Sequence, residues 1–228
     1  MQSITTYLFR VAVLGAVAAL AACASTPETS ADTTQKMRAA ETTLANFAKD
    51  PEMTWFRNNL KNARAIVISP RITRAGFVVG GSGGESLVLA RDGSGGWTGP
   101  AFYNMYAGSI GLQAGADVSE VIVLVMTQKA LDSLLSSSFK MGADGSISAG
   151  PVGVGAASNI KTDMVSFSRS KGVYAGLNLD GASLSPDTGA NGAFYGRPVS
   201  PVDILVTHSV SKPPAASSLQ QSLVQLSK

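Results

Sequence analysis

The sequence predicts an α+β fold, in which N-terminal amphipathic helices precede a glycine-rich, largely antiparallel β-sheet with one or two further helices. Two observations predict it. Apolar residues recur at helical spacing up to about residue 63, and from Ala65 onward short β-branched runs alternate with glycine. Charged residues make up 14% of the chain and aromatic residues 7%, against 24 glycines, so we expect a modest core with many close backbone contacts.

Two helices are expected at the start of the domain. Asp32 is a candidate N-cap with Gln35 three residues later, which begins a helix over about residues 33–49. Asp50 followed by Pro51 is a second start signal, because aspartate favours the N-cap and proline the first helical position. The predicted buried stripes of the two helices are Met37, Ala40, Leu44 and Phe47, then Met53, Phe56, Leu60 and Ala63.

Two groups of strands with short helices between them are expected in the rest of the domain. Thr127 is a candidate cap for a helix that runs to about Ser137, and Ser185-Pro186 for a short helix that runs to about Phe194. The predicted strands are residues 66–69, 76–80, 87–91, 109–114 and 121–127, then 152–157, 164–168, 173–179 and 202–206. We therefore place one domain at residues 33–210.

The last segment, residues 211–228, is expected to be a low-complexity tail. It begins with Pro213-Pro214 and continues in serine, glutamine and alanine, with Leu219, Leu223 and Leu226 at helical spacing. We predict a mostly mobile segment with at most one weak helix.

Cys23 is the only cysteine, and its position predicts a lipid anchor. Residues 1–22 have the polar start and apolar run of a signal peptide, and Leu20-Ala21-Ala22-Cys23 resembles the lipobox of bacterial lipoproteins. The resemblance implies cleavage before Cys23, lipid on its thiol and amine, and, because Ala24 follows, an outer-membrane location. Residues 23–32 are then a lipidated flexible tether. The alternative is a buried cysteine in an apolar helix.

The sequence contains motifs that resemble catalytic and cofactor-binding sites, but the surrounding sequence does not fit these functions. Residues 80–84 match G-x-S-x-G around Ser82, but a strand pattern follows where a nucleophile elbow needs a helix, so a hairpin loop is favoured. His208, the only histidine, is expected to be an exposed polar residue. Residues 153–158 approach a dinucleotide motif without the long helix. We expect no enzyme, cofactor or metal site, and a net charge of +3 argues against nucleic-acid binding.

A run of cations is the candidate binding surface. No acidic residue interrupts it, and Arg57, Lys61 and Arg64 recur at spacings that predict one shared helix face. Trp55 and Phe56 beside them could enter a headgroup region, although a core position is favoured for at least one. The alternative is that the cations only solubilise the domain. The predicted headgroup-binding residues are Arg57, Lys61, Arg64, Arg71 and Arg74.

Residues 65–205 resemble the SYLF domain family, also called the Ysc84 actin-binding domain family. The resemblance rests on ordered motifs: Ala65-Ile-Val-Ile-Ser-Pro70; Ala75-Gly76-Phe-Val-Val-Gly80-Gly81; Trp97-Thr98-Gly99-Pro100; Gly108-x-x-Gly111-Leu112-Gln113-x-Gly115; Ala149-Gly150-Pro151; Ser170-Lys171-Gly172-x-Tyr174-x-Gly176; and Asn191 followed by Phe194-Tyr195-Gly196. It implies binding of membrane lipids, phosphoinositides in eukaryotic members, and actin-filament binding in fungal members. Gly76, Gly111 and Gly150 are expected to permit turns or close strand contacts.

The expected function is a membrane-anchored, non-enzymatic envelope lipoprotein whose SYLF-like domain binds anionic phospholipid headgroups. The alternative is a protein-interaction module, with an envelope protein or an actin-like host protein as partner. The sequence leaves the lipid species, the side of the membrane and the oligomeric state open.

Overall fold

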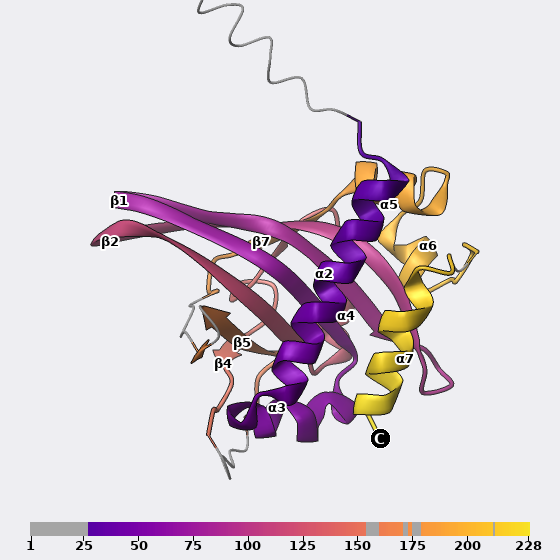
Figure 1. Ribbon diagram of the computed structural model, residues 1–228, viewed down its shortest axis with the longest axis horizontal. Helices are drawn as coiled ribbons and strands as arrows, with labels where there is room; N and C mark the ends of the chain where they lie inside the picture. Colours follow the sequence, from indigo (N-terminus) through magenta and orange to yellow (C-terminus); the bar gives the residue numbers. More distant parts are fainter. Residues whose placement is uncertain (1–26, 154–159, 171–172, 175–178, 212) are drawn as a thin grey trace, which may run out of the picture.

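The structure, a computed structural model, describes residues 27–153, 160–170, 173–174, 179–211 and 213–228, without the side chains of residues 77–79, 109–115 and 173–174. Figure 1 shows a curved sheet with helices packed against it. Cys23, the predicted signal peptide and most of the predicted tether lie outside the described residues. In the described part of the chain, no helix is long and apolar enough to cross a membrane.

The α+β fold predicted from the sequence is confirmed. The helices are α2 (Ser30–Lys49), α3 (Thr54–Asn59), α4 (Gln128–Leu134), α5 (Thr188–Tyr195), α6 (Pro201–Leu205) and α7 (Ala216–Leu226), with 3-10 turns η1 (Pro51–Met53) and η2 (Leu60–Asn62) on either side of α3. The strands are β1 (Ala65–Arg91), β2 (Trp97–Val125), β3 (Phe139–Lys140), β4 (Ile147–Ala149), β5 (Met164–Ser170), β6 (Val173–Tyr174) and β7 (Ser183–Pro186).

A long two-stranded ribbon, β1 with β2, forms the middle of the sheet. The strands pair antiparallel from Ala65 opposite Val125 to Arg91 opposite Trp97. The ribbon folds back on itself, because the Oγ atoms of Ser69 and Ser86 lie 2.7 Å apart although both belong to β1. The five strands predicted for this region are therefore two continuous strands with register shifts.

The prediction of a hairpin loop at residues 80–84 is wrong, because these residues lie within β1. A Cβ atom on Gly84 would lie 2.1 Å from the carbonyl oxygen of Arg71, on the other half of the same strand. Glycine here permits two halves of a strand to approach closely instead of breaking the strand.

The shorter strands extend the sheet from both parts of β2. Strand β7 pairs with one part and β5 with the other, while β3 pairs with β7 and β6 with β5, all antiparallel. Strand β4 pairs parallel with β5. The prediction of a largely antiparallel sheet is confirmed. Of the predicted strand over residues 173–179, the structure shows residues 173–174, and residues 175–178 lie outside the described part; residues 154–157 of another predicted strand do so too.

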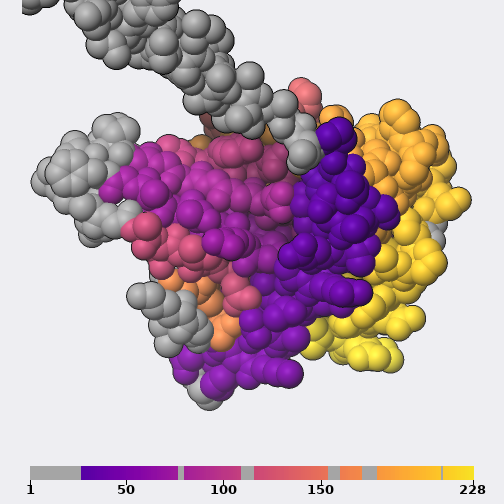
Figure 2. Space-filling model, turned by 45° about the horizontal axis from the view of Figure 1, so that its top comes forward, coloured from indigo at the N-terminus to yellow at the C-terminus, as the bar shows by residue number. Residues whose placement is uncertain are grey.

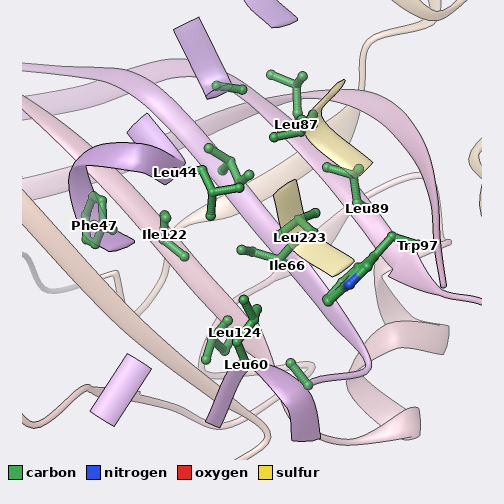
Figure 3. Close-up of a cluster of buried hydrophobic side chains, with 14 of the residues drawn as sticks. Leu44, Phe47, Leu60, Ile66, Leu87, Leu89, Trp97, Ile122, Leu124 and Leu223 are labelled. Carbon is green, nitrogen blue, oxygen red and sulfur yellow. The ribbon is translucent and has the colours of Figure 1, made fainter. Parts of the chain in front are cut away.

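One face of the sheet is covered by α2, α3, α5 and α7. Figures 1 and 2 show α2 (indigo) lying between the ribbon (purple to pink) and the C-terminal helices (orange and yellow). The predicted stripes of the first two helices are buried there, and Figure 3 shows Leu44 and Phe47 of α2 over sheet residues Ile66, Leu87 and Ile122. Because strand side chains alternate, residues such as Val67, Val88 and Val123 point to the opposite face, where α4 and α6 cover them.

Local caps explain where the helices begin. Helix α2 begins at Ser30 rather than at residue 33, because Thr29 is the N-cap and Asp32 completes a capping box with it. The predicted caps at Asp50 and Thr127 are confirmed. The predicted short helix begins at Thr188 behind the cap Asp187, since Ser185-Pro186 belongs to β7.

The predictions for the C-terminal region need two corrections. Residues 202–206 are not a strand: Ser200 and Asp203 form a capping box that begins α6, and Pro201 occupies its first turn. Residues 211–228 are not a tail outside the domain, because α7 buries Ala216, Leu219 and Leu223 completely. The apolar residues at helical spacing give this segment an amphipathic helix that packs on the domain, although its composition is of low complexity.

Candidate functional site

Arg57, the first of the predicted headgroup ligands, serves the end of helix α2. Its guanidinium donates to the backbone carbonyls of Ala48 (3.4 Å), Asp50 and Pro51 (3.5 Å), and to Thr54 Oγ1 (3.0 Å). The last carbonyls of a helix have no partners within the helix, and a cation there also interacts favourably with the helix dipole. Arg57 therefore has a structural role.

The predicted common face of Arg57, Lys61 and Arg64 does not form. Helix α3 ends at Asn59, the chain continues as a 3-10 turn, and it is extended from Ala63 onward. Asparagine side chains compete for backbone hydrogen bonds and disfavour helix interiors, which explains an end at Asn59. Arg64 therefore follows the helical segment. Trp55 and Phe56, the neighbouring aromatics, are both buried in the core.

Lys61 and Arg64 are exposed at the edge of the molecule where β1 begins, and neither makes an ion pair with the described residues. Arg91 lies beside them, since its backbone N–H donates to the Arg64 carbonyl at 2.8 Å. Its guanidinium donates to the carbonyls of Leu60 (3.2 Å) and Ala63 (3.3 Å). We call Lys61, Arg64 and Arg91 the basic edge. Arg91 is not among the predicted cations, because only the folding of the ribbon brings it here.

Arg71 lies among carboxylates, near the start of α2. It lines a hollow of about 690 Å³ between α2 and β1, whose other charged residues are Glu28, Asp32, Lys36 and Glu85. Lys36 Nζ contacts Glu28 Oε1 at 2.5 Å and Glu85 Oε1 at 2.8 Å. Hydrogen bonds from Thr29 hold the pKa of Asp32 below its usual range, so its carboxylate stays charged. We call the residues of this hollow the tether end.

Arg74 faces the opposite side of the sheet. It stands two residues after Ile72, which belongs to the core on the α4 side, and opposite Asp117 in the ribbon register. Hydrogen bonds from Ser170 and Ser119, and in smaller part the charge of Arg74, lower the pKa of Asp117. The five predicted cations are thus divided among four environments.

The catalytic candidates are not brought together. Ser82 lies within β1 and lines a hollow with Tyr106 and Lys140, whereas His208 lines a different hollow. His208 is exposed, and its Nδ1 lies 3.1 Å from Thr98 Oγ1. Residues 154–158 of the dinucleotide-like motif lie outside the described part. In that part, no group of three or more His, Cys, Asp or Glu residues is arranged to hold a metal ion.

The motif around Trp97-Thr98-Gly99-Pro100 joins the sheet to three helices. The Thr98 hydroxyl donates to the Ile204 carbonyl of α6 (3.0 Å), and the Tyr195 hydroxyl of α5 donates to the Pro100 carbonyl (2.8 Å). Gln220 Nε2 of α7 donates to the Gly99 carbonyl at 2.6 Å. These residues have no obvious chemical pattern in the sequence, and their shared role is visible only in three dimensions.

Two other motif residues have plain structural roles. Asn191 is buried, and its side chain accepts from the Phe102 N–H (2.8 Å) and donates to the Phe102 carbonyl (3.0 Å). It thus makes the two backbone hydrogen bonds that a neighbouring strand would make. A Cβ atom on Gly150 would lie 2.1 Å from the ring of Phe167. The expectation of a close contact at Gly150 is therefore confirmed.

Comparison with known proteins gives a consistent result. The family described as "Ysc84: Las17-binding protein actin regulator" matches residues 106–226, just over half of the chain. Protein YSC84 of Saccharomyces cerevisiae is 30% identical over 167 residues, which cover 70% of this chain and 35% of that protein. LAS seventeen-binding protein 3 of Saccharomyces cerevisiae is 28% identical over 167 residues, 70% of this chain and 36% of that protein.

An animal relative is matched in the same way. The SH3 domain-containing YSC84-like protein 1 of Bos taurus is 26% identical over 157 residues, 67% of this chain and 46% of that protein. The chain spans less than half the length of each of these relatives, of which one is named for binding LAS seventeen and one for its SH3 domain. On the family match and the identity to Protein YSC84, the chain belongs to the Ysc84 family.

Proposed function

We propose that this protein is a non-enzymatic, lipid-anchored protein of the bacterial cell envelope whose Ysc84-family domain binds anionic phospholipid headgroups through the basic edge. The supporting observation is that Lys61 and Arg64 are exposed and make no ion pair with the described residues. Each such cation contributes about 1 kcal/mol near an anionic surface, and salt screens this contribution over about 10 Å at 0.1 M.

The structure narrows the set of binding residues proposed from the sequence. Arg57 holds the end of α2, Arg71 shares its hollow with three carboxylates, and Arg74 stands opposite Asp117. Arg71 is exposed and makes no ion pair with the described residues, but the carboxylates around it reduce its attraction for an anionic surface. Arg91 adds charge to the basic edge, while its guanidinium remains bonded to backbone carbonyls.

The basic edge and the start of the described chain lie at opposite ends of α2. Figure 1 shows α2 running from the N-terminal end of the domain to α3 at the other end. A helix of 20 residues is about 30 Å long. Residues 23–29 span at most about 25 Å when extended. The basic edge cannot reach the anchoring membrane while α2 stands upright, so we infer that it either contacts a second membrane or turns the domain onto its side.

A flotation assay with unlipidated Cys23→Ser protein tests the headgroup proposal. The double variant Lys61→Glu, Arg64→Glu is expected to bind phosphatidylglycerol vesicles about 30-fold more weakly, because it loses two contributions of about 1 kcal/mol each. Vesicles of phosphatidylcholine alone give the background. Unchanged partitioning of the double variant would remove the basic edge from the proposal.

The matched control is Arg38→Glu, Lys140→Glu. Both residues are exposed, Arg38 on α2 and Lys140 on β3, and the net charge changes by the same amount as in the test variant. We expect this control to lose far less binding. An equal loss would show that net charge, rather than the basic edge, controls binding.

The second candidate function is protein binding. The matching family is described as a Las17-binding protein and actin regulator, and one relative is named for binding LAS seventeen. Val202 of α6, Val206 at its C-cap and Val224 of α7 are exposed at 38%, 48% and 36%, and offer apolar contacts. Co-sedimentation of the unlipidated protein with actin filaments tests this alternative. The absence of pelleting at micromolar filament concentrations would count against it.

A further inference from the structure

A small pocket lies where the Trp97 motif meets α6 and α7. Its volume is about 220 Å³, which suits one side chain or a small molecule rather than a larger ligand. The floor consists of buried residues and the mouth of more exposed ones. The lining residues are Asp92, Trp97, Thr98, Gly99, Tyr195, Ile204, His208, Val210 and Gln220.

Three hydrogen-bond donors around this pocket already donate to acceptors of the protein. The Thr98 hydroxyl donates to the Ile204 carbonyl, and the Tyr195 hydroxyl donates to the Pro100 carbonyl. Burial raises the pKa of Tyr195, so this hydroxyl keeps its proton. The indole N–H of Trp97 donates to Ser227 Oγ at 3.2 Å.

The acceptors, by contrast, are left without donors. Gln220 is 4% exposed, and its Oε1 has no hydrogen-bond partner among the described residues while its Nε2 bonds to Gly99. Such a buried carbonyl oxygen normally has a partner. Since the Thr98 proton goes to Ile204, His208 Nδ1 must donate to Thr98 Oγ1, and Nε2 of a neutral ring then remains an acceptor.

Asp92 places a negative charge at the mouth of the pocket. Its Oδ1 accepts from the backbone N–H groups of Ser94 (2.9 Å) and Gly96 (2.7 Å). Its Oδ2 accepts no hydrogen bond from the described residues. Hydrogen bonds from Ser94 are the main cause that lowers the pKa of Asp92, so the carboxylate is ionised at neutral pH. Arg91 precedes Asp92 in the chain but does not line the pocket, whereas His208 lines it and its charge lowers the pKa of Asp92 in smaller part.

We propose that this pocket binds a small organic cation, a primary ammonium or a guanidinium group, through Asp92 and Gln220. Such a group carries donors and no acceptors, which matches a pocket with free acceptors and occupied donors. The Trp97 ring already carries the Arg91 guanidinium, whose Cζ lies 4.5 Å from the ring centroid, so selection of the ligand rests on hydrogen bonds to Asp92 and Gln220 rather than on a cation–π contact. The cation can belong to a free amine or to a lysine or arginine side chain of a partner protein.

The test uses the indole N–H signal of Trp97 in the full unlipidated Cys23→Ser protein, assigned with a Trp55→Phe variant. Titration with n-butylammonium and n-butylguanidinium is expected to give saturable shifts in about the millimolar range, as befits so small a ligand. The neutral analogue n-butanol and the donor-free tetramethylammonium ion are expected to give no saturable shift. Equal responses to either of these would overturn the proposal.

The matched variant is Asp92→Asn, because asparagine keeps the oxygen that accepts from Ser94 and Gly96 but removes the charge. It is expected to keep the spectrum of the folded protein and to weaken cation binding about tenfold. Unchanged affinity in this folded variant, or no saturable shift in the parent protein, would refute the proposal. A blocked peptide with a single lysine then separates the sources, since tighter binding than n-butylammonium indicates a partner's side chain and equal binding a free amine.

Discussion

Cations at the two ends of helix α2 have opposite surroundings. At the tether end, Lys36 contacts two carboxylates and Arg71 shares the same hollow with three. At the basic edge, Lys61 and Arg64 are exposed and make no ion pair with described residues. A cation near carboxylates has less to gain from a lipid phosphate, so we expect the proposed binding surface to lie at the basic edge rather than at the tether end.

Arg57 adds a third environment close to the basic edge. It follows α2 directly in the chain, yet its guanidinium is held by backbone carbonyls and by Thr54. The contrast between Arg57 and Arg64 is therefore a contrast between a stabilising cation and a cation available for binding. Substitutions at these two positions separate stability from binding.

Arg57→Ala is expected to have the largest effect on stability. Several hydrogen bonds from a charged donor are lost at the end of α2, and we expect the free energy of unfolding to fall by about 3 kcal/mol. Urea unfolding followed by circular dichroism measures the change. The matched variant Arg64→Ala is expected to stay within about 0.5 kcal/mol of the parent. Equal losses in the two variants would erase the contrast.

Salt is expected to affect vesicle binding at the basic edge next most strongly. Raising ionic strength from 0.05 M to 0.5 M shortens the Debye length and weakens the attraction between exposed cations and an anionic surface. The advantage of the parent over the double variant Lys61→Glu, Arg64→Glu, about 30-fold at low salt, should become small. Flotation at both salt concentrations measures it. A salt-independent advantage would indicate apolar insertion instead.

Lys36→Met at the tether end is expected to lower the free energy of unfolding by about 1 kcal/mol near neutral pH, after allowance for solvent screening. Burial alone would lower the pKa of Lys36, but its hydrogen bonds to Glu28 and Glu85 outweigh burial and raise it. The stabilisation is therefore full below the unfolded-state pKa of about 10.4 and lost as pH rises through the higher folded-state pKa. Urea unfolding between neutral and alkaline pH tests this, and a difference that persists at the alkaline end would argue against it.

Asp32→Asn is expected to give the smallest change, with a pH dependence of the opposite sense. Hydrogen bonds from the Thr29 side chain and backbone lower the pKa of Asp32. Its contribution to stability is present above the unfolded-state pKa of about 3.9 and lost as pH falls through the lower folded-state pKa. Thermal unfolding of both proteins should differ near neutral pH and converge at acidic pH. A difference that grows on acidification would contradict the assignment of Asp32 to the capping box.

Predictions from the sequence succeeded where the determinants were local. The caps at Asp50 and Thr127 and the strand over residues 164–168 depend on neighbours in the chain, and all three are confirmed. The packing of helix α7 into the domain was missed, because a serine- and glutamine-rich composition predicted a mobile segment with at most one weak helix, and the burial of its leucines depends on distant elements. The strands of the ribbon were divided at glycines that in fact permit close contact between its halves.

The candidate site was less predictable than the fold. The spacing of Arg57, Lys61 and Arg64 implied one helix face only on the assumption that the helix continues, and it ends at Asn59. The carbonyl partners of Arg57 and the carboxylates around Arg71 come from other elements. Arg91 joins the basic edge through a ribbon that folds back on itself. A single sequence records the charges but not their compensation.

Vesicle bridging tests the central claim most directly. The protein is attached at its N terminus to neutral vesicles, and labelled phosphatidylglycerol vesicles are added as the second surface. We predict that the parent protein and the control Arg38→Glu, Lys140→Glu cluster the two populations, and that Lys61→Glu, Arg64→Glu does not. Clustering by the double variant at the level of the parent would contradict the account, because the basic edge would then be dispensable.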